Sequence, residues 1–232
     1  QFAVEDVSFS VRSGEVVGFA GLQGSGNSEL FYSLFGAYGT PLRGTVKLEG
    51  SDYHPKSPAH AMKHGLAMLT NDRKENGLVL GMNVTKNTTL AALRRFSPCG
   101  WLRRGAECTA AESRRRELGI RAASLEQEAS SLSGGNQQKL VIAKWLETKP
   151  KVLLLDEPTR GVDVGAKHDI YKLMAEWKKA GMAILLITSE LPELLALSDR
   201  IIVLHYGKIV NEFAGSDAAP ESVMTAAMGT RA

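Results

Sequence analysis

The spacing of hydrophobic residues divides the chain into segments with two different periods. Apolar residues alternate with serines over residues 7–11, which predicts a half-buried strand. The continuous apolar run Val16–Ala20 predicts a strand that is buried on both faces. It leads into the glycine-rich stretch Gly21–Gly26 and then into a helix that we expect to extend through Leu34. This part of the chain is therefore predicted to run from strands through a glycine loop into a helix.

A second group of elements follows before the pattern changes. Alternation over residues 46–48 predicts another short strand. Ser57 and Pro58 are typical of a helix N-cap and first helical residue, and Gly65 is typical of a helix end. The apolar run Leu66–Leu69 then predicts a further strand.

Residues 71–149 lack strand signals and are predicted to be helical. Thr109 and Glu112 have the spacing of a capping box, which predicts a helix start, and Gly119 predicts the end of that helix. Because strands occur on both sides of this span, we interpret it as a helical insertion into a sheet domain.

Strand character returns in the C-terminal third of the chain. Val152–Leu155 and Ala183–Thr188 are predicted to be buried strands, separated by a helix that ends near Gly181. The apolar face of that helix is formed by Ile170, Leu173, Met174 and Trp177. Arg200–Leu204 and Lys208–Val210 are predicted to form a hairpin. The whole pattern predicts an α/β fold with a mostly parallel sheet, antiparallel β elements and an inserted helical subdomain.

Composition excludes several other classes of protein. The chain has 232 residues, of which 44% are hydrophobic and 23% charged, as expected of a folded globular protein. Its apolar runs are much shorter than the roughly 20 residues of a membrane-spanning helix. We recognise no signal peptide, and the absence of an initial methionine suggests a fragment of a longer protein. The two cysteines match no metal or redox motif, which favours a reducing cytoplasmic setting.

Positive charge gathers in one place. The net charge is +3, and its main local source is a cluster formed by Arg103, Arg104 and Arg114–Arg116. Only Trp101 among aromatic residues lies beside this cluster, so we interpret it as a solvated helix face and expect no nucleic-acid partner.

The glycine stretch has the spacing of a phosphate-binding loop. In such loops, backbone N–H groups surround phosphate oxygens at a helix N-terminus. The candidate nucleotide-binding residues are Gly21, Gly24, Ser25, Gly26, Asn27 and Ser28. Asn27 stands where the motif has lysine, whereas Ser28 retains the hydroxyl that can bind Mg²⁺. Taken alone, the stretch could equally be an ordinary turn from strand to helix.

Two carboxylates end the strand that begins at Val152. Asp156 is suited to bind Mg²⁺ through water, and Glu157 to orient or deprotonate an attacking water molecule. Ligands of open α/β sheets bind at the carboxyl ends of the strands, where both side chains are expected. The alternative is a strand that merely ends in an acidic turn.

A third motif follows the insertion and opens a helix with one serine and two glycines. Such a helix start offers a hydroxyl and N–H groups to an anion, although it could also be a simple N-cap. The motif residues are Leu132, Ser133, Gly134, Gly135, Asn136 and Gln137. Together with the glycine loop and the paired carboxylates, this motif resembles the signature of ABC ATPases, and the resemblance covers essentially the whole chain.

The resemblance implies a P-loop NTPase fold of the ABC cassette type. It implies a RecA-like nucleotide-binding core at residues 1–70 and 148–213, a helical signature subdomain at residues 71–147 and a C-terminal tail at residues 214–232. The implied cofactors are ATP and Mg²⁺.

Further residues resemble the second cassette of importers for ribose, arabinose and galactosides. Asn71 stands where most cassettes have a metal-contacting glutamine, and Ser189 stands where an active cassette has a switch histidine. Asp163 resembles the acidic member of the loop that crosses the cassette interface, although it could also cap a helix. The resemblance implies the metal set Ser28, Asn71 and Asp156, and the catalytic positions Glu157 and Ser189.

In ABC ATPases, each nucleotide lies between the phosphate loop of one cassette and the signature of the other. The resemblance therefore implies that this chain supplies its signature to a partner cassette while its own nucleotide half is degenerate. The expected partners are a cassette N-terminal in the same polypeptide, transmembrane permease subunits and, indirectly, a sugar-binding protein. The expected location is the cytoplasmic face of the cell membrane. The alternatives are an independently active ABC ATPase and a soluble ABC protein of DNA repair or translation.

Overall fold

The computed structural model describes residues 4–39 and 43–229, which form parts of two compact units. The first unit contains Gln1–Met68, Lys151–Glu157 and Trp177–Ala232. The second unit contains Leu69–Pro150 and Pro158–Glu176.

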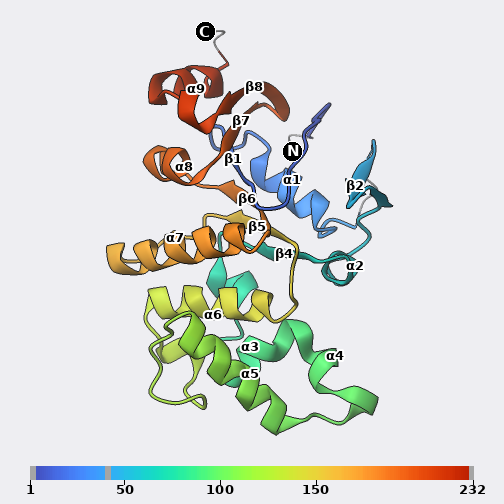
Figure 1. The fold of residues 1–232 in the computed structure, drawn as a ribbon, viewed down its shortest axis with the longest axis vertical. Helices are drawn as coiled ribbons and strands as arrows, with labels where there is room; N and C mark the ends of the chain where they lie inside the picture. The colour runs from blue at the N-terminus through green and yellow to red at the C-terminus, as the bar shows by residue number, and fades with distance from the viewer. Residues whose placement is uncertain (1–3, 40–42, 230–232) are drawn as a thin grey trace. The chain divides into compact units, whose positions relative to one another are not determined.

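The first unit is built on a mixed sheet (Figure 1). Within the described residues, the sheet has six strands in the order β4-β5-β6-β1-β7-β8. These strands are β1 (Val16–Ala20), β4 (Leu66–Leu69), β5 (Val152–Asp156), β6 (Ala183–Ile187), β7 (Arg200–His205) and β8 (Lys208–Ala214). Strand β1 pairs in parallel with β6 and β7, β5 pairs in parallel with β6, and β8 runs antiparallel to β7. The predicted α/β class with a mostly parallel sheet is confirmed.

The buried strands of this sheet form the core of the first unit. Every residue of β1, β4 and β6 is buried, as expected for continuous apolar strands that are covered on both faces. Phe19 lies at the middle of this core and makes edge-on ring contacts with Phe9 and Phe31, at centroid distances of 5.3 Å and 5.4 Å. Burial of one such aromatic side chain contributes about 1.5–3 kcal/mol.

Short helices complete the first unit. They are α1 (Asn27–Leu34), α2 (Pro58–Lys63), α8 (Leu191–Leu197), the 3₁₀ turn η5 (Gly215–Asp217) and α9 (Pro220–Ala227). A separate hairpin pairs β2 (Val46–Leu48) with β3 (Ser51–Tyr53). Helix α8 packs against β1, and α9 packs against β7 (Figure 1). The predicted cap of α2 is confirmed, since Ser57 Oγ accepts a hydrogen bond from the His60 N–H at 3.2 Å.

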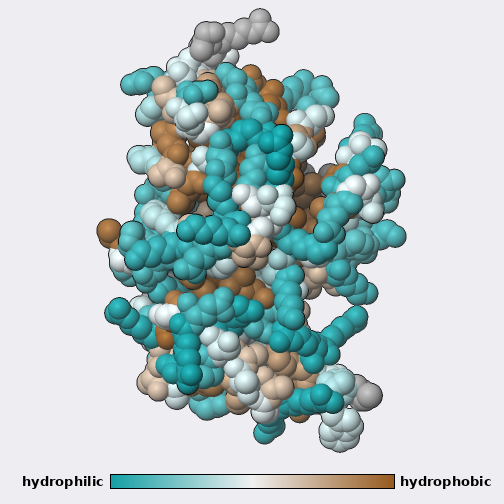
Figure 2. All heavy atoms as spheres, viewed as in Figure 1, coloured by the Kyte–Doolittle hydropathy of each residue, from teal (hydrophilic) through white to brown (hydrophobic). Residues whose placement is uncertain are grey.

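The described elements of the second unit are helices and helical turns. Its elements are the π-helical turn η1 (Arg73–Gly77), α3 (Val84–Thr89), the 3₁₀ turn η2 (Leu90–Ala92), α4 (Leu93–Phe96), the 3₁₀ turn η3 (Pro98–Gly100), α5 (Arg104–Glu117), the 3₁₀ turn η4 (Ala129–Ser131), α6 (Gly134–Leu146) and most of α7 (Val164–Lys179). Helices α3, α5 and α6 pack against one another (Figure 1). The surface over α7 is mostly hydrophilic in Figure 2, whereas its predicted apolar face is buried. No helix in the described ranges is both long and apolar enough to cross a bilayer.

Two predictions of local structure are wrong. Residues 7–11 keep the predicted alternation of burial but do not form a strand. Alternation reports which side chains are covered, whereas a strand also needs a neighbouring backbone to pair with. The capping box is also wrong, because α5 begins at Arg104 and Thr109 lies inside it. Thr109 Oγ1 donates to the Gly105 carbonyl at 2.9 Å, a bond that threonine makes within a helix.

Most of the arginine cluster is paired with carboxylates. Glu112 accepts hydrogen bonds from Arg115 and Arg116, which lower the pKa of the Glu112 carboxyl to about 2. Arg114 lies 2.6 Å from Glu147, a side chain that is only 4% exposed. The cluster is therefore a set of ion pairs along α5, in agreement with its interpretation as a helix face.

A buried lysine gives the second unit a testable pH dependence. Lys144 is 7% exposed and donates to the Gly77 carbonyl at 2.5 Å. Desolvation lowers the pKa of Lys144 from 10.5 to about 8. Between these two values the unfolded chain retains a proton that the folded chain has released, so the free energy of unfolding must rise with pH. At about 1.4 kcal/mol for each pKa unit, the rise is about 3 kcal/mol.

We therefore expect Lys144→Met to flatten the pH profile of stability. Urea unfolding between pH 7.5 and pH 10.5 would measure the free energy of unfolding of both proteins. Lys74→Met, which replaces an exposed lysine, is the matched control and should keep the parental profile. Equal profiles for the parent and Lys144→Met would contradict this assignment.

Candidate functional site

The glycine loop between β1 and α1 depends on residues without side chains. A Cβ atom at Gly21 would lie 2.5 Å from Ser25 Oγ and 2.6 Å from the Leu204 carbonyl oxygen. Gly26 has φ 103°, a left-handed conformation that favours glycine, and it is the N-cap of α1. The loop therefore makes a tight turn at a helix N-terminus, as predicted.

The backbone of this loop is supported by the turn between β7 and β8. The Gly207 N–H donates to the Ser25 carbonyl at 2.7 Å, and the Ser25 N–H donates to the Leu22 carbonyl at 2.9 Å. This support was not predictable from the sequence. The hairpin itself has a sequence signal, but no signal places it beside β1.

Asn27 lies at the start of α1 and is 7% exposed. Among the described residues, its side-chain oxygen Oδ1 has no hydrogen-bond partner although it is buried. A glycine cradle at a helix N-terminus fits phosphate oxygens through its backbone N–H groups, although Asn27 supplies no side-chain cation.

The predicted catalytic residues Glu157 and Ser189 lie together within the first unit. Strand β5 ends at Asp156, which is 1% exposed, and Glu157 follows with φ 52°. Ser189 Oγ donates to Glu157 Oε2 at 3.2 Å, and the Glu157 N–H donates to the Ile187 carbonyl at 2.9 Å. A positive φ at a residue other than glycine is strained, and such strain is common at functional sites.

Two of the three predicted metal-binding residues belong to the first unit. Ser28 lies in α1 and Asp156 ends β5, and these two elements pack against each other. A hydroxyl and a carboxylate are oxygen ligands of the kind that Mg²⁺ prefers. Asn71 is exposed and belongs to the second unit, so the complete metal set stays a prediction.

The signature residues lie at the N-terminus of α6 in the second unit. Ser133 is the exposed N-cap residue, and its hydroxyl accepts a hydrogen bond from Asn136 Nδ2 at 2.8 Å. Asn136 Oδ1 in turn accepts from the Arg121 N–H at 2.7 Å. Asn136 thus orients the serine hydroxyl at a helix end that attracts anions.

Close packing explains the other signature residues. A Cβ atom at Gly134 would lie 2.9 Å from Arg73 Nη2, and one at Gly135 would lie 2.6 Å from the Ala166 Cβ. Leu132 is 7% exposed, and Gln137 Nε2 donates to the Ala129 carbonyl at 3.0 Å. The start of α6 is therefore packed tightly on its inner side and open at Ser133.

Asp163 caps helix α7. Its Oδ1 accepts a hydrogen bond from the Ala166 N–H at 2.9 Å, and its carbonyl accepts one from the Lys167 N–H at 3.0 Å. The alternative of a helix cap is thus confirmed. The role of Asp163 at a cassette interface stays a prediction.

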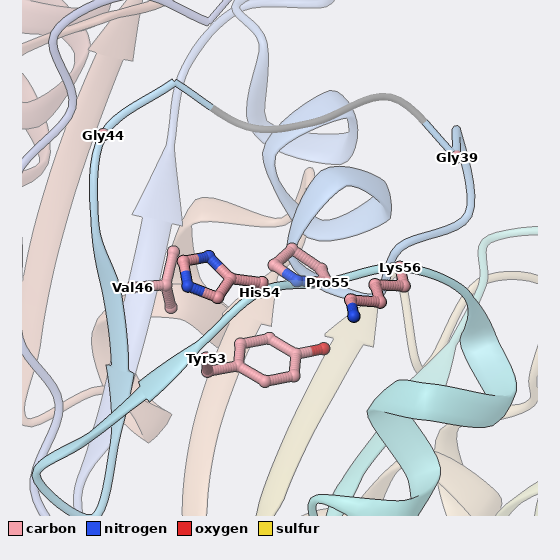
Figure 3. A pocket seen from close by; sticks show the side chains of 7 residues that line it. All are labelled: Gly39, Gly44, Val46, Tyr53, His54, Pro55 and Lys56. Carbon is pink, nitrogen blue, oxygen red and sulfur yellow. The ribbon is translucent and has the colours of Figure 1, made fainter.

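A separate pocket of about 340 Å³ lies beside the β2–β3 hairpin (Figure 3). Its lining residues are Gly39, Gly44, Val46, Tyr53, His54, Pro55 and Lys56. Tyr53 donates from its hydroxyl to the Leu34 carbonyl at 3.0 Å, and burial raises the pKa of Tyr53 to about 12. None of these residues belongs to the predicted site, so the pocket does not change its assignment.

Comparison with solved structures supports the same fold. The ADP conformation of an ATP-binding cassette of an ABC transporter is similar at a TM-score of 0.76 and 26% identity, with 97% of this chain and 89% of that chain covered. A nucleotide-free cassette from an ABC transporter is similar at a TM-score of 0.74 and 26% identity, with 90% of this chain and 84% of that chain covered.

Curated relatives are more similar in sequence. The xylose import ATP-binding protein XylG of Geobacillus kaustophilus (strain HTA426) is 47% identical over 97% of this chain and 45% of its own length. The ribose import ATP-binding protein RbsA of Bacillus subtilis (strain 168) is 48% identical over 98% of this chain and 46% of its own length. The chain thus spans about half the length of the curated relatives it matches.

The family model described as ABC transporter matches residues 4–160, which include the glycine loop, the signature and the paired carboxylates. This match and the cassette fold agree with the geometry of the motifs. The chain belongs to the ABC transporter family and is similar in sequence to sugar import ATP-binding proteins.

Proposed function

We propose that this chain is the second cassette of a sugar importer, with a degenerate nucleotide half and a complete signature half. The single observation that carries this proposal is the contrast between the two motifs. The signature has an exposed, oriented serine at a helix N-terminus, whereas the glycine loop offers Asn27 in place of a cation. The relatives are named as xylose and ribose import ATP-binding proteins, which supports a monosaccharide as the transported substrate.

The chain's own nucleotide half is expected to bind ATP weakly. Gly21, Gly24, Ser25 and Gly26 supply the phosphate cradle, and Ser28, Asp156 and Asn71 would hold Mg²⁺, which neutralises phosphate charge. A charge-assisted hydrogen bond contributes about 1.5–3 kcal/mol. Loss of the lysine therefore weakens binding by about one to two orders of magnitude.

The second unit serves another cassette in this proposal. Ser133, Gly135 and Asn136 contact the γ-phosphate of nucleotide that is bound to the partner's phosphate loop, and Asp163 lies in the loop that crosses the interface. The exposed N-cap position of Ser133 supports this role, because a helix N-terminus favours negative charge. The relatives are about twice as long as this chain, which supports a second cassette in the same polypeptide, and we propose that this cassette is the N-terminal one.

Coupling to transport requires a membrane partner. We assign residues 71–147 as the signature subdomain that docks on permease subunits, which receive sugar from a binding protein on the other side of the membrane. Exposed apolar side chains in this span support a protein contact; they are Val79, Leu90, Leu93, Trp101 and Leu102. The chain would then lie at the cytoplasmic face of the membrane, with no role in nucleic-acid binding.

A second candidate is an independently active ABC ATPase. The hydrogen bond between Ser189 and Glu157 favours it, because Glu157 keeps the carboxylate of a general base and Ser189 orients it. In this case Asn27 and Ser189 would be tolerated substitutions.

Steady-state phosphate release from the purified chain separates these two functions. We expect turnover far below about 1 s⁻¹, the lower end of the usual enzyme range, because Asn27, Asn71 and Ser189 leave the site short of charge and without a switch. Glu157→Gln is the matched control for background hydrolysis. Turnover of about 1 s⁻¹ or more that Glu157→Gln abolishes would establish the independent ATPase instead.

A further inference from the structure

We propose that Arg73 is a positioning residue that holds the interface loop against the start of α6, so that Ser133 and residues 159–163 face the partner cassette as one surface. This inference rests on the proposed function of the signature. All of the residues that carry it belong to the second unit.

The guanidinium of Arg73 binds two consecutive carbonyl oxygens of the interface loop. Nη1 donates to the Arg160 carbonyl at 2.8 Å, and Nη2 donates to the Gly161 carbonyl at 3.3 Å. Gly161 has φ 65°, a conformation that favours glycine and brings its carbonyl oxygen within reach of the guanidinium group. A planar guanidinium can hold two acceptors at once, which a lysine ammonium does less well.

The same guanidinium lies against the signature. A Cβ atom at Gly134 would be 2.9 Å from Arg73 Nη2 and 3.1 Å from the Gly161 carbonyl oxygen. Gly134 is therefore the residue that lets the arginine and the interface loop approach the first turn of α6. Three segments that are distant in the sequence meet at one side chain.

The π-helical turn that contains Arg73 is capped at its start and bonded to α6 at its end. Asp72 Oδ1 accepts hydrogen bonds from the Lys74 and Glu75 N–H groups at 2.9 Å and 3.0 Å, which caps the π-helical turn η1. At the other end of the turn, Lys144 Nζ donates to the Gly77 carbonyl. Short π-helical segments occur often at functional sites.

Stability alone does not account for an arginine at this place. The positive end of the α6 dipole faces this region, so a cation beside it is electrostatically unfavourable. Within the described residues, the buried Arg73 Nε has no hydrogen-bond partner. The arginine is better explained by its two hydrogen bonds to the interface loop and its contact with the signature than by a gain in the stability of α6.

Hydrogen exchange of this chain tests the structural part of the inference. In Arg73→Lys and Arg73→Ala, the amide hydrogens of residues 160–163 should exchange with solvent about tenfold faster or more, because the loop loses its two hydrogen bonds from the guanidinium group. Lys74→Ala, at an exposed neighbour, should leave exchange unchanged. Unchanged exchange in both Arg73 variants would overturn the proposal. If Arg73→Ala fails to fold, Arg73→Lys still tests it, because lysine keeps the positive charge and the aliphatic part of the side chain.

ATPase kinetics of the full-length subunit with its permease test the functional part. Arg73→Lys should lower kcat about tenfold or more with KM for ATP changed less than about twofold, because the partner's phosphate loop still binds nucleotide. Lys74→Ala should match the parent. If Arg73→Lys keeps the full kcat while Ser133→Arg abolishes hydrolysis, the positioning role of Arg73 is overturned but the proposed function of the signature is not. If Ser133→Arg keeps full activity, the proposed function fails, and the exchange result still decides whether Arg73 holds the loop.

Discussion

Ser133→Arg is expected to abolish transport-coupled ATP hydrolysis by the full-length subunit assembled with its permease. The Ser133 hydroxyl is exposed at the N-terminus of α6 and is oriented by Asn136. Arginine at this position would fill the space that we assign to the γ-phosphate of the partner's nucleotide. Removal of one hydrogen-bond donor to the transition state, here the serine hydroxyl, lowers kcat by about 10²–10³. The bulk of the arginine also prevents the two cassettes from closing around the nucleotide. Phosphate release in the presence of permease and binding protein measures this loss.

Two substitutions in the first unit are the matched controls. Asn27→Ala removes a side chain from a loop that lacks its cation, so we expect less than about a twofold loss of activity. Glu157→Gln changes the carboxylate that accepts from Ser189, and we expect a moderate loss, well below the about 10²–10⁴-fold effect of removing a working general base. Retained activity in Ser133→Arg together with complete loss in Glu157→Gln would reverse the assignment of the competent and degenerate sites.

Asn27→Lys is expected to tighten binding of ATP·Mg²⁺ to this chain by about tenfold or more. The loop already has the backbone of a phosphate cradle, with Gly26 in a left-handed conformation at the start of α1. Lysine would add one charge-assisted hydrogen bond to that cradle. Titration calorimetry on the parent and the variant gives both dissociation constants directly.

The control for this gain is Asn27→Gln, which lengthens the side chain without adding charge. It should bind nucleotide about as weakly as the parent, within roughly twofold. The gain in Asn27→Lys should also diminish at high salt, because ionic interactions are screened. A dissociation constant that stays the same in Asn27→Lys would mean that the loop does not act as a phosphate cradle.

Continuous apolar runs predicted the sheet well. The predicted strands at Val16–Ala20 and Leu66–Leu69 agree with β1 and β4, and β5 extends the predicted run only by Asp156. Strands buried on both faces need hydrophobic residues at every position, so their sequence signal is strong. The helix start at Ser57 and Pro58 was equally predictable. The serine cap and the fixed φ of proline both act within one turn of helix.

Weaker local patterns gave wrong answers. The spacing of Thr109 and Glu112 fits a helix start, yet the same spacing occurs inside α5, where Thr109 bonds to Gly105. Alternation over residues 7–11 predicted burial but not pairing. A pattern of a few residues reports one local preference, and tertiary contacts decide which of several compatible structures forms.

The sequence by itself determined the kinds of chemical group at the site. It identified the glycine loop with Asn27, the carboxylates after β5, and the serine that opens α6, because these motifs are continuous in the chain. Only the tertiary structure decided which distant groups meet. Ser189 reaches Glu157 across 32 residues, and Arg73 reaches Gly161 across 88. Such contacts depend on how separate segments pack, and closing a long stretch of chain costs entropy that only the whole packed unit offsets.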